Sequence, residues 1–204
     1  MVIAGLTGSI AMGKSTTAAM FRAFGVPVFD ADLAVHDMMA PGGEATAAVL
    51  AAFGDVATPA GGIDRKRLGA AVFDDRAALK RLEGILHPRV RQAERRFLAL
   101  CRRNGDALVV LDIPLLFEGG GARRCDATVV VSAPAHVQRS RALARPGMTA
   151  ERLARILAQQ MPDREKRRRA DFVVRTGLGR ALALADVRRV VATLSGCVLR
   201  GDGR

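Results

Sequence analysis

The sequence has few of the aromatic side chains on which nucleic-acid bases stack. Its 204 residues include no tryptophan, no tyrosine and eight phenylalanines. Proteins that bind single strands use such rings as stacking platforms. Lysine is also scarce, because the 32 basic residues are 28 arginines and 4 lysines. The formal net charge of +12 leaves three explanations open: a solvated basic face, a site for a small phosphorylated substrate and, least favoured, nucleic-acid binding.

The charge is concentrated in the later part of the chain. Residues 1–60 carry 2 basic and 5 acidic side chains, a net of −3, whereas residues 61–204 carry 30 and 15, a net of +15. The segment 139–180 alone has 12 basic and 4 acidic residues. Such a cluster suits a compact polyanionic ligand at least as well as a polymer, so we expect no nucleic-acid partner.

Cysteine, histidine and long apolar runs are scarce as well. The cysteines are too far apart for a C-x-x-C pair or a disulfide framework and are expected to be reduced core residues: Cys101, Cys125 and Cys197. The three histidines are scattered, which gives no indication of a zinc site. The strongest apolar run, residues 107–117, is too short for a membrane span, and residues 1–13 lack the basic side chain of a secretory signal. We expect a cytosolic protein that does not bind membranes.

The apolar pattern predicts an α/β fold. Five continuous apolar runs are expected to be strands buried on both faces, and hence a five-stranded parallel sheet between helices: Val2–Thr7, Val26–Phe29, Ala107–Ile113, Ala127–Ser132 and Phe172–Arg175. About 75 residues separate the second and third runs, too many for one crossover helix. We predict a single domain over residues 1–204 with a helical insertion over residues 32–104. Helices are expected to begin at Asp74-Asp75, at Pro88 and at Thr149.

The most specific motif is Gly8-Ser9-Ile10-Ala11-Met12-Gly13-Lys14-Ser15, which matches G-x-x-x-x-G-K-[ST] after the first predicted strand. Its chance occurrence in a sequence of this composition is roughly 0.3%. Glycines let backbone N–H groups curl around phosphate oxygens at a helix N-terminus. Lys14 is predicted to reach the β- and γ-phosphates, Ser15 to hold Mg²⁺, and Thr16 to lie beside the α-phosphate. A glycine-rich turn that binds nothing is the less favoured alternative.

The motif indicates a nucleoside triphosphate but not a reaction, since GTPases, ATPase motors and small-molecule kinases share it. Asp30 and Asp32 follow the second strand, at the end where parallel sheets bind ligands. One could accept a proton from an attacking hydroxyl while the other caps the next helix, and we favour Asp32 as the base. Asp112 ends the third apolar run as a Walker B aspartate does, so it is predicted to orient Mg²⁺. Its alternative is a bond to nearby backbone or to Ser15.

These motifs form part of a longer pattern that resembles the dephospho-coenzyme A kinases. The resemblance extends from Gly5 to about Gly177 and rests on the order and spacing of many segments. Those segments are Gly5-Leu6-Thr7-Gly8, Val28-Phe29-Asp30-Ala31-Asp32, Pro41-Gly42, Phe53-Gly54, Asp64-Arg65, Leu82-Glu83, His87-Pro88-Arg89-Val90, Asp112-Ile113-Pro114-Leu115-Leu116-Phe117-Glu118, Gln138 with Arg141 and Arg145, Gln159-Gln160, Glu165-Lys166 and Ala170-Asp171.

The resemblance implies a P-loop kinase core, a helical substrate subdomain and a mobile lid over about residues 135–165. It implies ATP- and Mg²⁺-dependent phosphorylation of the ribose 3′-hydroxyl of dephospho-CoA, the last step of coenzyme A synthesis. Asp32 would be the catalytic carboxylate, assisted by Lys14 and by Arg141. The implied ATP-binding residues are Gly8, Ala11, Met12, Gly13, Lys14, Ser15, Thr16, Arg141 and Arg145.

Thr7 is implied to line the site near the transferred phosphate, and His87 to help shape the substrate subdomain, although His87-Pro88 could equally begin a helix. Arg164–Arg169 is expected to be a solvated helix face, with attraction for the acceptor's pyrophosphate as the alternative. The chain departs from the family pattern at Ala11, where glycine is usual, and at Met12, where a small residue is usual. It also has Arg175-Thr176-Gly177 where the family often has an Asn-containing turn.

Overall fold

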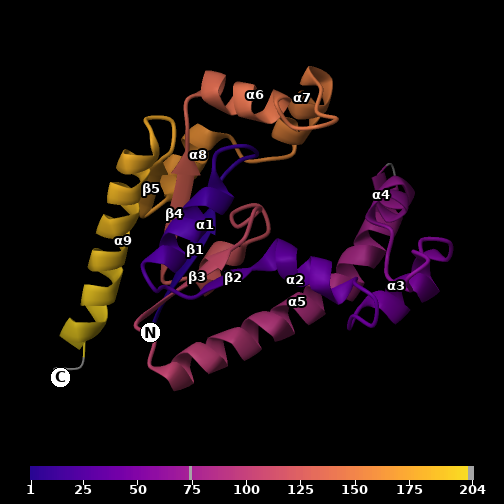
Figure 1. Cartoon of the computed structure of the whole chain (residues 1–204), viewed down its shortest axis with the longest axis horizontal. Coiled ribbons are helices and arrows are strands. Elements are labelled where there is room, and N and C mark those ends of the chain that lie inside the picture. Colours follow the sequence, from indigo (N-terminus) through magenta and orange to yellow (C-terminus); the bar gives the residue numbers. More distant parts are fainter. Residues whose placement is uncertain (74, 202–204) are drawn as a thin grey trace. The chain divides into compact units, whose positions relative to one another are not determined.

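The computed structural model describes the backbone of residues 1–73 and 75–201 and the side chains of these residues up to residue 196. The chain divides into two compact units, one formed by Met1–Phe29 with Cys101–Arg204 and the other by Asp30–Leu100. The first unit contains the sheet and the second is helical (Figure 1).

The sheet has five strands in the order β2-β3-β1-β4-β5. They are β1 (Val2–Thr7), β2 (Val28–Asp30), β3 (Leu108–Asp112), β4 (Ala127–Ser132) and β5 (Phe172–Arg175). Parallel pairing places Leu6 of β1 beside Asp112 of β3, and Thr7 beside Val130 of β4. The predicted α/β class and parallel sheet are therefore confirmed.

The second strand begins two residues later than predicted. The N–H of Val26 donates to the carbonyl of Phe21 at 3.1 Å, which ties Val26 to the end of a helix. Pro27 has no N–H to donate to a ladder. The strand therefore begins at Val28, although the Pro27 carbonyl already accepts the Val110 N–H of β3 at 2.9 Å.

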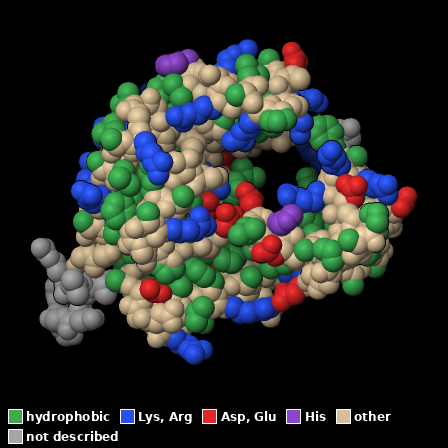
Figure 2. Space-filling view, viewed as in Figure 1, with side chains coloured by type: hydrophobic (Ala, Val, Ile, Leu, Met, Phe, Trp, Pro, Cys, Tyr) green, Lys and Arg blue, Asp and Glu red, His purple; other side chains and the backbone are tan. Residues whose placement is uncertain are grey.

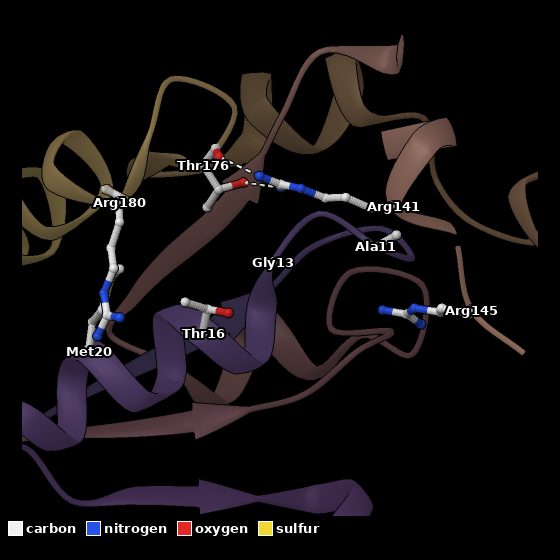
Figure 3. Close-up of a pocket in the computed structure, with 9 residues that line it drawn as sticks. Ala11, Gly13, Thr16, Met20, Arg141, Arg145, Thr176 and Arg180 are labelled. Carbon is white, nitrogen blue, oxygen red and sulfur yellow. Dashed lines mark hydrogen bonds between the residues drawn. The ribbon is translucent and has the colours of Figure 1, made fainter. Parts of the chain in front are cut away.

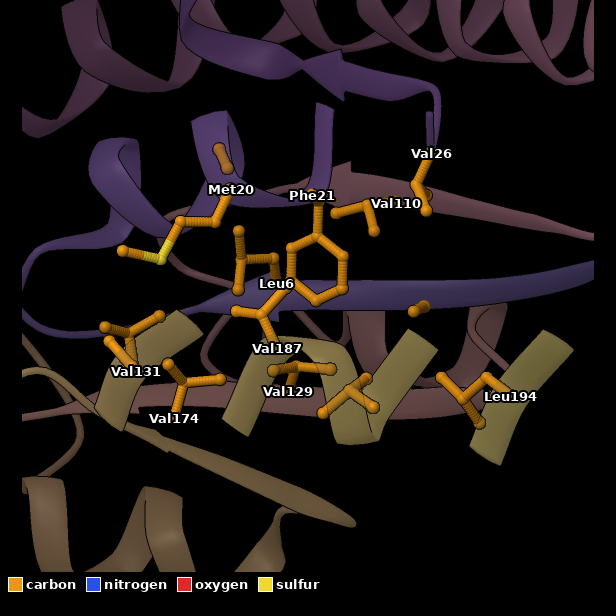
Figure 4. Packing of buried hydrophobic residues seen from close by; sticks show 14 of the residues in the cluster. Leu6, Met20, Phe21, Val26, Val110, Val129, Val131, Val174, Val187 and Leu194 are labelled. Atoms are coloured by element: carbon orange, nitrogen blue, oxygen red, sulfur yellow. The ribbon is translucent and has the colours of Figure 1, made fainter. Parts of the chain in front are cut away.

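Helices α1 (Lys14–Ala23) and α9 (Arg180–Gly201) pack on one face of the sheet. Phe21 of α1 and Val187 of α9, both fully buried, join Leu6 of the central strand in one apolar cluster (Figure 4). Burial of a side chain such as Phe21 contributes about 2–3 kcal/mol. This cluster holds the start of α1, and with it the phosphate loop, against the end of β1.

On the other face, β1 approaches Leu116 and Cys125 so closely that only glycine fits at position 5. A β-carbon on Gly5 would lie 2.7 Å from the Cys125 Sγ and 2.8 Å from Leu116 Cδ2. Cys101 is buried, at 2% exposure, as expected of a core residue, whereas Cys125 is only half-buried. The side chain of Cys197 lies outside the described residues.

The remaining helices of the sheet unit follow β4. The chain forms a short 3₁₀ turn η1 (Gly121–Arg124) before β4, and α6 (Ala135–Leu143), α7 (Ala150–Ala158) and α8 (Asp163–Arg169) after it. Thr149 caps α7 as predicted, because its hydroxyl accepts the Arg152 N–H at 3.2 Å. Helices α6 and α7 lie beyond the end of the sheet where the phosphate loop leaves β1 (Figure 1).

The helical unit comprises α2 (Ala31–Met38), α3 (Thr46–Phe53), α4 (Arg65–Phe73) and most of α5 (Arg76–Asn104) around its own apolar core. Asp75 begins α5 by accepting the N–H groups of Ala77 and Ala78, whereas Asp74 lies outside the described residues. No helix in the described part of the chain is long and apolar enough to cross a membrane.

The prediction that Pro88 begins a helix is wrong, because Pro88 lies inside the 29-residue helix α5. Proline removes one helical hydrogen bond and disturbs its neighbours. The helical acceptor of a residue 88 N–H would be the Gly84 carbonyl, and at the next carbonyl, that of Ile85, the Arg89 guanidinium Nη1 donates at 2.7 Å. The sequence signal misled because proline suits the first turn of a helix.

Candidate active site

The phosphate loop connects β1 to α1 and owes its shape to two glycines with different roles. Gly13 caps α1 in the left-handed conformation, with φ 95°. Gly8 is needed for space, because a β-carbon there would lie 2.8 Å from the Val131 carbonyl oxygen of β4. The loop therefore lies against the neighbouring strand while its backbone turns into the helix.

Ala11 is in the left-handed region, with φ 61°, and among the described residues it is the only non-glycine residue with a positive φ. This conformation costs an alanine about 1–2 kcal/mol. The methyl group is 7% exposed and packs with Ala142 of α6 and Leu153 of α7. Packing against these helices offsets part of the strain, and the loop forms despite the missing glycine.

Met12 contributes to the core through its side chain and to the loop through its backbone. The side chain is 2% exposed, and its Sδ accepts the Ala133 N–H at 3.1 Å. Its carbonyl accepts the Thr176 hydroxyl at 2.6 Å. The bulkier residue at the tip therefore points into the apolar cluster.

Lys14 and Asp112 form an ion pair at the base of the loop, with Lys14 Nζ donating to Asp112 Oδ1 at 2.6 Å. The Asp112 side chain is 1% exposed and that of Lys14 is 16% exposed. This ion pair can form because the sheet register puts the end of β3, where Asp112 lies, beside the end of β1, which leads into the loop. The sequence predicted roles for both residues but did not reveal that they contact each other.

A cavity of about 300 Å³ lies beside the loop and the start of α1 (Figure 3). Its lining comes from the loop, α1, α6 with the turn after it, the turn after β5 and the start of α9: Ala11, Gly13, Thr16, Met20, Arg141, Arg145, Thr176, Arg180 and Ala183. Thr16 and both predicted lid arginines are thus brought to one cavity. Ser15 is exposed in the first turn of α1. A volume of this size is at the lower end of the range for small-molecule sites.

Arg141 is held across this cavity by the turn after β5. Its Nη1 donates to the Thr176 hydroxyl at 3.2 Å and its Nη2 to the Thr176 carbonyl at 2.8 Å (Figure 3). Arg145 lies on the side of the cavity nearer Ala11, and Arg180 on the opposite side. Three guanidinium groups therefore surround the space beside the loop.

Asp186 fixes the turn after β5 and was missed by sequence reasoning. Its buried carboxylate, 2% exposed, accepts the backbone N–H of Arg175 at 3.0 Å and two guanidinium bonds from the same residue. Arg189 adds a contact at 2.9 Å. The hydrogen bonds from Arg175 outweigh the effect of burial and lower the pKa of Asp186. The sequence signal that could have revealed Asp186 is an acidic residue on the side of α9 that is buried.

The other predicted site residues lie at the end of β1, at the start of α2 and on α5. Thr7 is fully buried, and its hydroxyl donates to the Pro114 carbonyl at 2.8 Å, which holds the segment after β3. Asp30 caps α2 by accepting the Leu33 N–H at 3.0 Å, and Asp32 is exposed in the first turn of that helix. His87 is exposed on α5. Of the two neighbouring aspartates, Asp30 is therefore the one that caps α2.

The expectation that residues 164–169 form a solvated helix face does not hold for one residue of the segment. Lys166 of α8 is completely buried, and its Nζ lies 2.9 Å from Glu118 Oε1. This is an ion contact without the alignment of a hydrogen bond. Glu118 also accepts the Met161 N–H at 2.8 Å. Elsewhere, Lys and Arg side chains are spread over the face seen in Figure 2 and do not form a single patch.

Comparison with known proteins identifies the family. A family model for dephospho-CoA kinase matches residues 2–179. A dephospho-CoA kinase of Mesorhizobium japonicum is 56% identical over 96% of this chain and 98% of its own length, and one of Paramagnetospirillum magneticum is 62% identical over 96% and 92%.

Solved structures agree in fold. A crystal structure of a Thermus thermophilus protein matches with a TM-score of 0.83 at 35% identity, covering 94% of this chain and 96% of that one. A dephospho-CoA kinase structure from Campylobacter jejuni matches with a TM-score of 0.66 at 24% identity, covering 95% and 97%. The match of the family model to most of the chain and the identity of the full-length relatives lead to one conclusion: this chain belongs to the dephospho-CoA kinase family.

Proposed function

We propose that this protein transfers the γ-phosphoryl group of ATP to the ribose 3′-hydroxyl of dephospho-CoA, giving coenzyme A and ADP, and that it does so in the cytosol. The observation that carries the proposal is the joining of a phosphate loop, the Lys14–Asp112 pair and a cavity bordered by Arg141, Arg145 and Arg180 in one unit. Family membership supports the identity of the acceptor.

The loop and the arginines stabilise the negative charge on the phosphate oxygens during transfer. Backbone N–H groups at the start of α1 bind phosphate oxygens with help from the helix dipole. Lys14 turns its ammonium from Asp112 toward the β- and γ-phosphates, and Arg141 and Arg145 neutralise the phosphoryl oxygens in the transition state. Water exclusion by α6 and α7 favours transfer to the alcohol over hydrolysis.

The chain offers ligands that suit Mg²⁺. Ser15 and Asp112 supply a hydroxyl and a carboxylate, the hard oxygen ligands that this ion prefers. Bound there, the ion would add positive charge at the β- and γ-phosphates. Asp112 contacts Lys14 in this structure, so the ion would bind after Lys14 turns toward the nucleotide.

Asp32 is proposed as the catalytic carboxylate that accepts the proton of the 3′-hydroxyl. Asp30 is engaged as the α2 cap, whereas Asp32 extends from the exposed side of the same first turn. Thr7 is proposed to act near the transferred phosphate through the segment that it holds at Pro114. His87 is proposed to help shape the acceptor subdomain rather than to take part in chemistry.

A coupled assay of ADP release tests the proposal. We expect turnover with ATP, Mg²⁺ and dephospho-CoA, and none with adenosine or AMP as the acceptor. Equal activity on ordinary nucleosides would instead indicate a different P-loop kinase. ATP hydrolysis that is stimulated by DNA or RNA, with binding that weakens steeply with salt, would indicate a nucleic-acid enzyme.

A further inference from the structure

We propose that Thr176 is a positioning residue that couples the phosphate loop to Arg141. Thr176 lies in the turn after β5, where the family pattern often has an Asn-containing segment. The inference rests on the proposed function, since it assigns Arg141 to phosphoryl transfer. It adds a residue whose own hydroxyl touches both parts of the machinery.

The Thr176 hydroxyl orients the loop backbone. It donates to the Met12 carbonyl at 2.6 Å, while the Ser132 carbonyl, at 3.4 Å, is a much longer alternative acceptor. A trans peptide is planar, with its C=O and N–H pointing in opposite directions. Fixing the Met12 carbonyl on Thr176 therefore directs the Gly13 N–H away from Thr176. This N–H belongs to the start of α1, where the loop binds phosphate.

The same side chain fills the space above Gly13. A β-carbon on Gly13 would lie 3.3 Å from Thr176 Cβ, Cγ2 and Oγ1 alike. Thr176 thus packs against the loop through its carbon atoms and bonds it through its oxygen. Loss of the hydroxyl alone would leave the packing in place, which makes the two contributions separable.

The hydroxyl also accepts from Arg141. A hydroxyl has one proton to donate and lone pairs to accept. Thr176 donates to Met12 and accepts Arg141 Nη1 at 3.2 Å, and its carbonyl accepts Nη2 at 2.8 Å. These two contacts set the plane of the guanidinium while its other N–H groups remain directed elsewhere. A planar fork fixed in this way loses less freedom when it binds a phosphoryl oxygen.

Thr176 is itself fixed by the elements beneath it. Its N–H donates to the Ser132 carbonyl at 2.9 Å, which extends the β4–β5 pairing by one residue. The preceding Arg175 is tied to buried Asp186 through its backbone and its guanidinium. The position of Arg141 is therefore set by the sheet through Thr176, and the lid arginine is aligned before the substrate arrives.

Three variants test the coupling: Thr176→Val removes the hydroxyl and keeps the shape, Thr176→Ser keeps the hydroxyl, and Thr128→Val is the matched control. The hydroxyl of Thr128 bonds Asp171 at 2.7 Å and does not line the cavity. We expect Thr176→Val to lower kcat by about tenfold or more, as loss of an aligned donor does. Thr176→Ser should stay within about threefold of wild type, and Thr128→Val should leave kcat unchanged whatever its effect on the melting temperature.

A double-mutant cycle with Arg141→Ala identifies the route of the effect. If Thr176 acts through Arg141, Thr176→Val should lower kcat by less than about twofold in the Arg141→Ala background. In the same Arg141→Ala background, Thr176→Val should still weaken ADP binding, measured by calorimetry. The reason is that the substitution also removes the bond from the Thr176 hydroxyl to the Met12 carbonyl. Wild-type kcat in Thr176→Val, or a full tenfold loss that persists without Arg141, would overturn the proposal. Absence of turnover in the wild type would instead refute the proposed function.

Discussion

Glu118→Gln should destabilise this protein more than removal of the lysine that Glu118 contacts. Lys166 is fully buried, whereas the Glu118 side chain is 19% exposed. The substitution removes the negative charge and leaves the ammonium buried without a counter-charge. Breaking one side of a buried pair costs about 3–5 kcal/mol. Because Glu118 keeps some contact with water, we expect the lower end of that range, about 3 kcal/mol.

The reciprocal change has a smaller expected cost. Lys166→Met replaces the cation by an apolar side chain of similar length, and Glu118 keeps its bond from the Met161 N–H and its partial hydration. We expect a loss of about 1 kcal/mol. The double variant Glu118→Gln/Lys166→Met should therefore be more stable than Glu118→Gln alone, since it no longer buries an uncompensated charge.

Urea unfolding at neutral pH measures these differences if the dependence on denaturant is the same for all variants. Glu165→Gln is the matched control on the same helix, because its partners Arg168 and Arg169 are well exposed and such pairs are worth at most about 1 kcal/mol. The reasoning is refuted if Lys166→Met costs more than Glu118→Gln. It is equally refuted if the double variant is no more stable than Glu118→Gln.

Three further predictions concern other parts of the chain. Asp32→Asn should abolish phosphoryl transfer and leave ATP affinity nearly intact by calorimetry; lost ATP binding would show that its role is misassigned. Gly5→Ala should cost about 2 kcal/mol in urea unfolding because its β-carbon would overlap Leu116 and Cys125, and an unchanged midpoint would contradict that packing. Asp186→Asn should lower stability by about 2 kcal/mol at pH 7. The folded pKa of Asp186 is lowered, so its contribution is present above the unfolded pKa of about 4 and is lost as the pH falls through the folded value. The wild type and Asp186→Asn should therefore converge in strong acid, and a constant difference down to low pH would contradict this.

The sheet could be predicted because its strands are written as continuous apolar runs, and β3 and β4 are buried along their whole length. The bounds of residues 2–7, 127–132 and 172–175 were predicted correctly, although β5 at the edge is only partly buried. Pro88 misled because proline suits a first helical turn, whereas here it lies inside α5. The local sequence around Pro88 does not show that the helix continues through it.

The site was predictable where one short segment carries the chemistry. The phosphate loop is such a segment, and the lid arginines came from a family resemblance. The contacts of Lys14 with Asp112, of Thr176 with Met12, and of Glu118 with Lys166 join residues far apart in sequence. Spacing along one chain does not specify these pairs; the parallel register and the crossovers between strands bring them together.

Analysis of the reaction product tests the central claim most directly. After incubation with ATP, Mg²⁺ and dephospho-CoA, phosphorus NMR of the purified product should show a new phosphomonoester on the ribose 3′-oxygen, formed in equal amount to ADP. A 3′-deoxy analogue of dephospho-CoA should give neither product. A phosphate found on any other atom, or ADP released at the same rate with the 3′-deoxy analogue, would contradict the account.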